Sequence, residues 1–158
     1  MIKIKVSYNG KQYECEKYEK KDEKDLIERY FFWRVSTFIT ANKKLRKPPI
    51  PEDFSEPFCC YVGNLVHKRG AGPDAFKLDS NGNVIRTIEI KATTTDSGFQ
   101  GVKKYSFDEL YWLDLSEFKQ LKYKIYKFTH DQIPTSARCN LGNLDGELIS
   151  SGLICMIK

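Results

Sequence analysis

The chain begins with two alternating runs of residues on either side of Asn9-Gly10. In residues 2–8 an apolar side chain occupies every second position, and lysine or serine fills the positions between them. This period of two is typical of a β-strand with one buried face, and Asn-Gly is the strongest short signal for a tight hairpin turn because both residues tolerate a positive φ. The sequence therefore predicts an N-terminal β-hairpin that returns through residues 11–15.

Two helices are predicted after the hairpin. In residues 24–46 apolar side chains recur every three or four positions, and three prolines between residues 48 and 51 stop this helix. Its apolar excess leaves two interpretations open: packing in the core, or a surface where two copies of the chain meet. A second helix is predicted from Ser55, the expected N-cap, to about residues 68–70. The cations at the end of the first helix suit its dipole, and they are Lys43, Lys44, Arg46 and Lys47.

The rest of the chain is predicted to be mainly β-structure. Two short strands, at residues 73–78 and 84–91, flank a turn at Ser80-Asn81-Gly82-Asn83. Residues 92–105 carry few apolar side chains and predict a loop. Two more strands, a short helix and an apolar C-terminal segment are then expected at residues 110–113, 121–128, 141–150 and 153–157. The chain is therefore expected to have an α/β (α+β) fold.

The composition limits the classes of protein to which the chain can belong. With 158 residues, 41% hydrophobic and 30% charged, it has the size and composition of one globular domain. No apolar run reaches the roughly 18–20 residues needed to cross a bilayer, and the charged N-terminus lacks a secretory signal, so a cytoplasmic protein is expected. The five cysteines have no paired Cys-x-x-Cys spacing and are expected to be reduced thiols. The net charge of +5 permits a polyanionic partner without requiring one.

The residues most suggestive of chemistry are Asp74 and the run Glu89-Ile90-Lys91. A tight turn between the two predicted strands brings Asp74 and Glu89 close together, and alternation places Glu89 and Lys91 on one face of the second strand, with Ile90 on the other. Two adjacent carboxylates repel each other, and a divalent cation relieves that repulsion. Mg²⁺ is the expected cation because it prefers oxygen ligands and binds through one or two carboxylates together with a phosphate. The alternative is an exposed strand whose alternating charges form a solvated face.

This pattern, Pro73-Asp74 followed by Glu89-Ile90-Lys91 after a hairpin turn, resembles the PD-(D/E)XK nuclease superfamily. The continuation Lys91-Ala92-Thr93-Thr94-Thr95 and the later run at residues 107–113 are similar to those of type II restriction endonucleases. The resemblance covers about residues 54–128. It implies a restriction-endonuclease-like central mixed sheet flanked by helices. It also implies Mg²⁺-dependent hydrolysis of phosphodiester bonds that leaves a 5′-phosphate, with Mn²⁺ as a substitute ion.

The resemblance also implies roles for individual residues. Many members of the superfamily add an acid from the preceding helix, for which Glu56 is the candidate and Glu28, in the earlier helix, is the alternative. The other implied roles are metal ligation by Asp74, Glu89 and the main-chain carbonyl of Ile90, and catalysis by the amine of Lys91.

DNA contacts are expected from two polar segments. The first leaves the predicted catalytic strand, and its amide and ammonium groups suit base edges and phosphates; the alternative is a polar surface loop. The second precedes the last predicted helix, where the alternative is a helix-leading loop with Asn140 as its cap. His67 is expected at the end of the second helix, with a phosphate contact as its second interpretation. The predicted DNA-binding residues are Thr93, Thr94, Ser97, Gln100, Lys103, Lys104, Arg138 and Asn140.

The sequence thus predicts a Mg²⁺-dependent type II restriction endonuclease that cuts double-stranded DNA at specific sites. Because one active site cuts one strand, we expect a homodimer with twofold symmetry that reads a near-palindromic site. The alternatives are another nuclease of the superfamily, such as a junction resolvase or a mismatch-nicking enzyme, and a non-catalytic basic DNA-binding module. A companion methyltransferase is not evident from the sequence. Residues 1–158 are expected to form a single nuclease domain, with 1–50 as a hairpin and helix for dimerisation, 54–128 as the catalytic core and 129–158 as a C-terminal segment.

Overall fold

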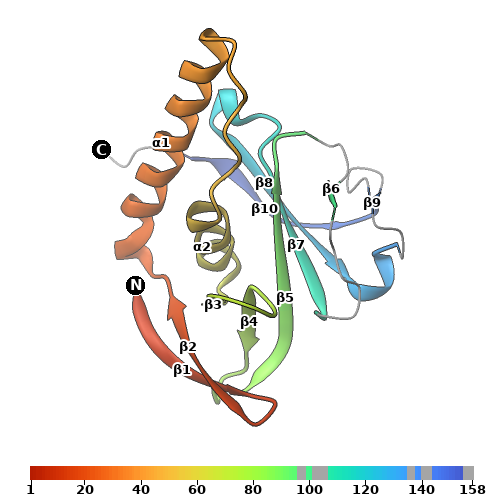
Figure 1. Cartoon of the computed structure of the whole chain (residues 1–158). Helices are drawn as coiled ribbons and strands as arrows, with labels where there is room; N and C mark the ends of the chain where they lie inside the picture. Colours follow the sequence, from red (N-terminus) through yellow and green to blue (C-terminus); the bar gives the residue numbers. More distant parts are fainter. Residues whose placement is uncertain (96–98, 101–106, 135–137, 140–143, 155–158) are drawn as a thin grey trace.

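The structure is a computed structural model that describes residues 1–95, 99–100, 107–134, 138–139 and 144–154. In this part of the chain eight strands form one sheet, in the order β1-β2-β3-β4-β5-β7-β8-β10, and two α-helices cover one of its faces (Figure 1). Neighbouring strands are antiparallel except β5 and β7, which are parallel. The expected α/β fold with a mixed sheet and an N-terminal hairpin is confirmed. The elements are β1 (Ile2–Tyr8), β2 (Lys11–Lys17), η1 (Lys20–Asp22), α1 (Glu23–Asn42), α2 (Glu52–Gly63), β3 (Val66–Lys68), β4 (Ala75–Leu78), β5 (Val84–Thr93), β6 (Phe99–Gln100), β7 (Glu109–Asp114), η2 (Phe118–Gln120), β8 (Lys122–Thr129), η3 (His130–Gln132), β9 (Arg138–Cys139) and β10 (Glu147–Leu153).

The N-terminal hairpin forms as predicted. Asn9 and Gly10 adopt positive φ angles of 47° and 72°, which lets β1 and β2 pair along their whole length. The inner face of the hairpin places Val6 and Cys15 against Phe76 of β4, and all three side chains are buried. The hairpin therefore extends the sheet beyond β3.

Both helices have boundaries that differ from the predicted ones. α1 ends at Asn42 rather than near residue 46, and Lys44 then adopts a left-handed φ of 55°. α2 begins at Glu52, with Pro51 rather than Ser55 as its N-cap, and the Ser55 hydroxyl donates to the Pro51 carbonyl at 3.1 Å. Neither helix, nor any other helix in the described ranges, has the length and apolar character needed to span a bilayer.

Pro57 lies inside α2, and Arg29 of α1 compensates for it. A proline has no N–H, so the carbonyl of Asp53, four residues earlier, loses its helical partner. The Arg29 guanidinium donates to that carbonyl at 2.7 Å and also pairs with Asp25 at 2.6 Å. This contact ties α1 to the first turn of α2.

Two segments predicted as helical are strands. The helix expected to reach residues 68–70 ends at Gly63 because Asn64 has a left-handed φ of 50°, and the next residues form β3 between β2 and β4. The helix expected at residues 141–150 is wrong for residues 144–150, which hold no helix and include the start of β10, paired with β8; residues 141–143 lie outside the described residues. In both places the hydrogen bonds offered by an open strand edge outweigh local helix preference.

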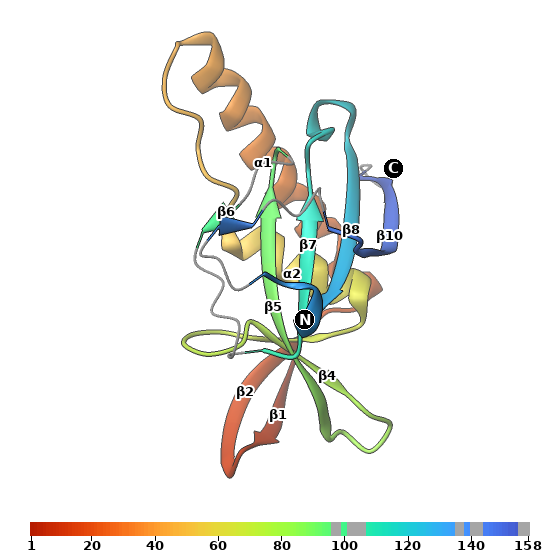
Figure 2. The same ribbon diagram turned by 90° about the vertical axis from the view of Figure 1, so that its right-hand side faces the viewer.

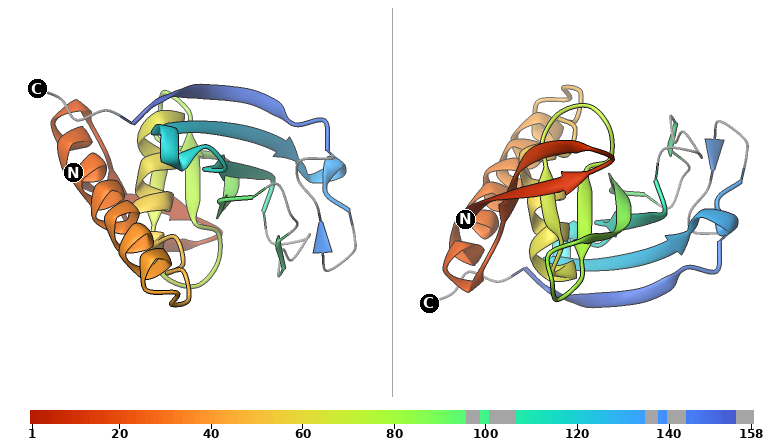
Figure 3. Two further views of the ribbon diagram at one scale, coloured as in Figure 1. Left: turned by 90° about the horizontal axis from the view of Figure 1, so that it is seen from above. Right: turned by 90° about the horizontal axis from the view of Figure 1, so that it is seen from below.

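The main hydrophobic core lies between the sheet and the helices. Figure 3 shows α2 between α1 and the sheet, and Tyr30 and Trp33 of α1 are among the largest buried side chains. A smaller cluster around Leu110 and Trp112 fills the opposite face of β7, on the side where β6 and β9 lie (Figure 2). Because strands alternate, neighbouring residues of β7 face different clusters: Tyr111 and Leu113 lie in the main core, and Leu110 and Trp112 lie in the smaller cluster.

Candidate active site

Asp74 lies at the end of the β4–β5 ladder. Its backbone N–H donates to the Ile88 carbonyl at 2.9 Å, and its carboxylate Oδ2 accepts a hydrogen bond from the Ile90 N–H at 2.8 Å. β4 pairs with β5 only as far as Ile88, so no β4 carbonyl is paired with the Ile90 N–H. The Asp74 carboxylate accepts that hydrogen bond instead. Lys68 fixes the preceding loop, because its ammonium donates to two of the carbonyls there. Asp74 is therefore anchored to β5 through both its backbone and its side chain.

Glu89 and Lys91 project from the same face of β5, as the alternation predicts. Lys91 Nζ lies 2.5 Å from Glu89 Oε1, and the two side chains are 28% and 15% exposed, respectively. Ile90, between them, is buried in the main core. The N–H and C=O of a strand residue leave the same edge of the strand, so the Ile90 carbonyl faces the edge on which Asp74 lies.

Glu56 of α2 is a third acid near Asp74. The pKa of Asp74 is raised to about 6, chiefly by burial; the negative charges of Glu89 and Glu56 also raise it, whereas the Ile90 N–H and the Lys91 ammonium act in the opposite direction. The charges of the other three predicted catalytic residues thus all act on Asp74.

Glu28, the alternative acid, does not join this group. Its side chain is 60% exposed on α1 and lies 3.8 Å from Lys24. The sequence favoured Glu56 because the helix of Glu28 lies earlier in the chain, and the packing of α2 places Glu56 near Asp74.

His67, predicted at the end of a helix, is a residue of β3 and is only 3% exposed. Its Nε2 lies 2.8 Å from Glu56 Oε2, and its Nδ1 lies 3.4 Å from Glu16 Oε2 of β2. Glu16 Oε2 also accepts a hydrogen bond from the Tyr18 hydroxyl at 2.7 Å. The imidazole therefore holds the Glu56 carboxylate in one orientation beside the acid cluster.

Sequence reasoning missed this role because it continued the second helix through His67. The signal that would have found it is Gly63-Asn64, since glycine and asparagine are the residues that most readily end a helix in the left-handed conformation. A strand of only three residues carries too short a pattern to be recognised by alternation.

The sequence model of the Bsp6I restriction endonuclease family matches residues 18–140. The chain belongs to this family. The matched range contains all four residues of the acid and amine cluster, and it confirms the expected relation to type II restriction endonucleases, whose substrate is DNA. No curated protein and no solved structure matches the chain.

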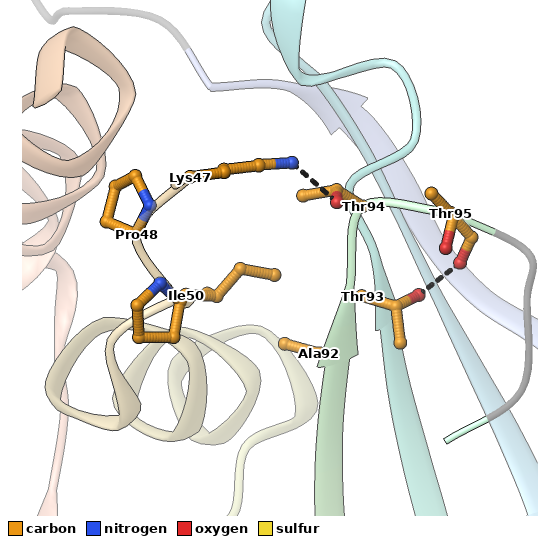
Figure 4. Close-up of a pocket in the computed structure, with 8 residues that line it drawn as sticks. Lys47, Pro48, Ile50, Ala92, Thr93, Thr94 and Thr95 are labelled. Carbon is orange, nitrogen blue, oxygen red and sulfur yellow. Dashed lines mark hydrogen bonds between the residues drawn. The ribbon is translucent and has the colours of Figure 1, made fainter. Parts of the chain in front are cut away.

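In this member of the Bsp6I family, two predicted DNA-contacting threonines already have partners within the chain. Thr93 Oγ1 accepts a hydrogen bond from Trp112 Nε1 at 2.8 Å and donates to the Thr95 carbonyl at 2.6 Å. Thr94 Oγ1 accepts a hydrogen bond from Lys47 at 2.6 Å across a hollow at the end of β5 (Figure 4). Thr93 thus serves to hold the end of β5, whereas Thr94 faces the hollow.

The other predicted DNA contacts are described only in part. Gln100 and Arg138 are paired with each other in the two-stranded β6–β9 sheet, which lies on the face of the main sheet away from the helices (Figure 2). This pairing brings the two predicted polar segments together, although they are far apart in the sequence. Ser97, Lys103, Lys104 and Asn140 lie outside the described residues.

The acid cluster offers oxygen ligands of the kind that Mg²⁺ prefers. In the ranges that the structure describes, no group of three or more His, Cys, Asp or Glu side chains is placed to hold a metal ion. Asp74 and Glu89 supply two carboxylates, which is the number that Mg²⁺ commonly uses when waters and phosphate oxygens complete its shell. The pKa of Asp74 is raised by burial and by the charges of Glu89 and Glu56, so a bound cation would stabilise the charged form of this carboxylate. The donors therefore fit a Mg²⁺ ion that is bound together with a phosphate.

Proposed function

We propose that this chain is a Mg²⁺-dependent type II restriction endonuclease that hydrolyses specific phosphodiester bonds of double-stranded DNA and leaves 5′-phosphate ends. The observation that supports this proposal most is the cluster of Asp74, Glu89 and Lys91 at one edge of β5. Family membership supplies the class of substrate, and the cluster supplies the groups that phosphodiester hydrolysis needs.

In the proposed site, Asp74, Glu89 and the Ile90 carbonyl would hold the Mg²⁺ ion, and Mn²⁺ is expected to substitute for it. When bound, the ion lowers the pKa of a water molecule and neutralises charge on the phosphate. Lys91 is placed to orient the attacking water or to stabilise negative charge at the phosphate, because its ammonium lies beside Glu89 and remains partly exposed. Glu56 adds a further carboxylate, which His67 keeps in position.

Cutting both strands most simply requires two copies of the chain, and α1 offers a surface for a second copy. Phe32, Val35 and Ile39 lie along one side of this helix with 78%, 51% and 50% of their surface exposed. Large apolar side chains grouped in this way are typical of interaction surfaces. We expect them to be buried in a homodimer with twofold symmetry.

The dimer is tested by replacing Phe32 and Val35 with glutamate and measuring the molar mass in solution by light scattering. The wild-type chain is expected to have twice the mass of a protomer, and the double variant the mass of one protomer. In the variant, dimerisation would bury the introduced glutamates of both copies without a cationic partner. Lys24→Glu, on an exposed part of the same helix, is the matched control. A monomeric wild-type chain that still cuts both strands would contradict the dimer.

The activity is tested by incubating the purified chain with linear, nicked and branched duplex DNA, in Mg²⁺ and separately in EDTA. We expect cleavage of linear duplex at recurring sites in Mg²⁺ only, with 5′-phosphate ends. Preferential cutting of branched or mismatched DNA would indicate a resolvase or a nicking enzyme instead. DNA binding without cleavage in either condition would indicate a non-catalytic module and contradict the proposal.

A further inference from the structure

A group of cations lies near the end of β5, beyond the proposed active site. All of its members are exposed, and within the described part of the chain none forms an ion pair with an aspartate or a glutamate. Most come from the segment between α1 and α2, at the top of Figure 1, and one comes from η2. They are Lys43, Lys44, Arg46, Lys47 and Lys119, which we call the basic cluster.

Lys47 is the member of the basic cluster that is held in a defined position. Its Nζ lies 4.8 Å from the centre of the Phe118 ring and 5.9 Å from that of Trp33, and it donates to Thr94 Oγ1 at 2.6 Å. Arg34 supports this arrangement, because its guanidinium donates to two carbonyls of η2 at 3.2 and 2.9 Å. The ammonium therefore rests on two aromatic rings and points toward the end of β5 (Figure 4).

The surroundings of Lys47 favour an anion. An ammonium has three N–H donors, and the Thr94 hydroxyl uses one of them. Burial and the charge of Lys119 both lower the pKa of Lys47, and no carboxylate of the described residues is among the groups that shift it. A hollow of about 420 Å³ opens beside the ammonium, lined by residues 47–50 and 92–95. This space is large enough for a phosphate group and its neighbouring sugar.

The position of the hollow along β5 relates it to the proposed site of cleavage. Thr94 follows Lys91 by three residues, which corresponds to about 10 Å along a strand. The hollow opens on the face of the sheet that the helices cover, and Lys91 projects from the other face, so a duplex that reaches both lies across the end of β5.

We propose that Lys47 and Thr94, assisted by the other cations of the basic cluster, bind a backbone phosphate of the DNA. This inference rests on the proposed function, since it takes the nuclease substrate as the ligand. The contact would help to hold the duplex at the end of β5 without reading its sequence, because a phosphate is the same at every nucleotide. It also gives Lys47 a role that differs from the interaction with the helix dipole expected from the sequence.

The test measures binding of duplex DNA in EDTA, where no cleavage occurs, over a series of salt concentrations. For Lys47→Gln we expect a decrease of about 0.9 in the magnitude of the slope of log K against log salt, and binding that is about 5- to 10-fold weaker near 0.1 M salt. Thr94→Val is expected to weaken binding by a smaller factor, about 2- to 3-fold, since one neutral hydrogen bond is lost. Lys47→Arg, which retains the charge, is expected to keep the wild-type slope.

Lys11→Gln is the matched control, because this exposed lysine lies at the tip of the hairpin, at the opposite end of the molecule from the basic cluster (Figure 1). An equal loss of slope in Lys11→Gln and Lys47→Gln would mean a general effect of net charge and would overturn the inference. Inorganic phosphate, added at constant ionic strength, is expected not to displace the DNA; displacement that requires Lys47 would assign the hollow to free phosphate instead.

Cleavage by the wild-type chain in Mg²⁺ is measured alongside to separate the two proposals. If the slope depends on Lys47 but the wild-type chain never cuts DNA, the phosphate contact is supported and the proposed function is contradicted. If the wild-type chain cuts DNA but Lys47→Gln keeps the wild-type slope, the proposed function is supported and the phosphate contact is contradicted.

Discussion

Two half-buried carboxylates lie on opposite sides of β5, and their surroundings differ in charge. Glu109 lies on the β7 side with 13% of its side chain exposed, and Arg86 Nε is 3.8 Å from its Oε1. Glu109 is also one of the negative charges that raise the pKa of Lys127, after Glu147. Its Oε2 has no hydrogen-bond partner in the described residues, but cations of the protein lie on both sides of it.

Asp74, on the β4 side, has other acids near it. Its pKa is raised chiefly by burial and then by Glu89 and Glu56, and Lys91 is the cation that opposes them. A carboxylate between cations of the protein is typical of a structural cluster, whereas an acid whose surroundings disfavour its charged form is a candidate for a functional site. This difference is why we propose metal binding for Asp74 and its neighbours and not for Glu109.

The comparison predicts that neutralising Asp74 abolishes most cleavage, whereas neutralising Glu109 leaves the cleavage rate almost unchanged. Asp74→Asn is expected to lower the rate of duplex cleavage in Mg²⁺ by at least about 10³-fold, because it removes a charged ligand from the reacting centre. Glu109→Gln is expected to stay within about threefold of wild type. The rates are measured under single-turnover conditions. A strong loss in Glu109→Gln with a normal rate in Asp74→Asn would reverse the assignment.

Glu56 and His67 are expected to act as one unit. His67→Gln and Glu56→Gln should each lower the rate of cleavage by about 10- to 100-fold, as is usual for groups that orient a metal site, and the double variant should lose little more than either single variant. DNA binding in EDTA is expected to be unchanged, which separates a positioning role from a loss of folding. Additive losses in the double variant would contradict coupling through the hydrogen bond between them.

Stability is expected to change in the direction opposite to activity. The folded chain raises the pKa of Asp74 from 3.8 to about 6, so it binds the proton more tightly than the unfolded chain does, and the stability of the wild type falls as the pH rises from about 4 to 6. Asp74→Asn removes this loss and is expected to raise the free energy of unfolding by about 1–3 kcal/mol above pH 6. Below pH 4 the two proteins should be equally stable.

Denaturant unfolding of the wild type, Asp74→Asn and Glu109→Gln at pH 4, 6 and 8 measures this difference. Glu109→Gln is the control, since it loses its interactions with Arg86 and Lys127 and is not expected to gain stability as the pH rises. A wild type that is more stable than Asp74→Asn at pH 8 would mean that Asp74 is a satisfied structural acid.

The parts of the fold that follow from local patterns could be predicted from the sequence. Asn9-Gly10 determines the hairpin because the two residues supply the turn and the alternation supplies both strands. The shared face of Glu89 and Lys91 follows from the period of a strand. These features depend on residues that are close together in the chain.

The parts that depend on tertiary contacts could not be predicted in this way. β3 and β10 form because neighbouring strands offer open edges, and no local sequence pattern predicts these two strands. The spacing of Glu28 and Glu56 did not distinguish them, since the choice depends on how α2 packs. Likewise, the cations after α1 were visible in the sequence, but the contact of Lys47 with Thr94 arises only in the folded chain.

The most direct test of the central claim compares wild type and Lys91→Ala in the digestion of mixed genomic DNA with Mg²⁺, followed by sequencing of the fragment ends. We expect wild-type fragments to share one short sequence at their ends and to carry 5′-phosphates. Lys91→Ala, which replaces a partly exposed side chain and should fold normally, is expected to yield no such ends. The same recurring ends, produced at the same rate by Lys91→Ala, would contradict the account of the site.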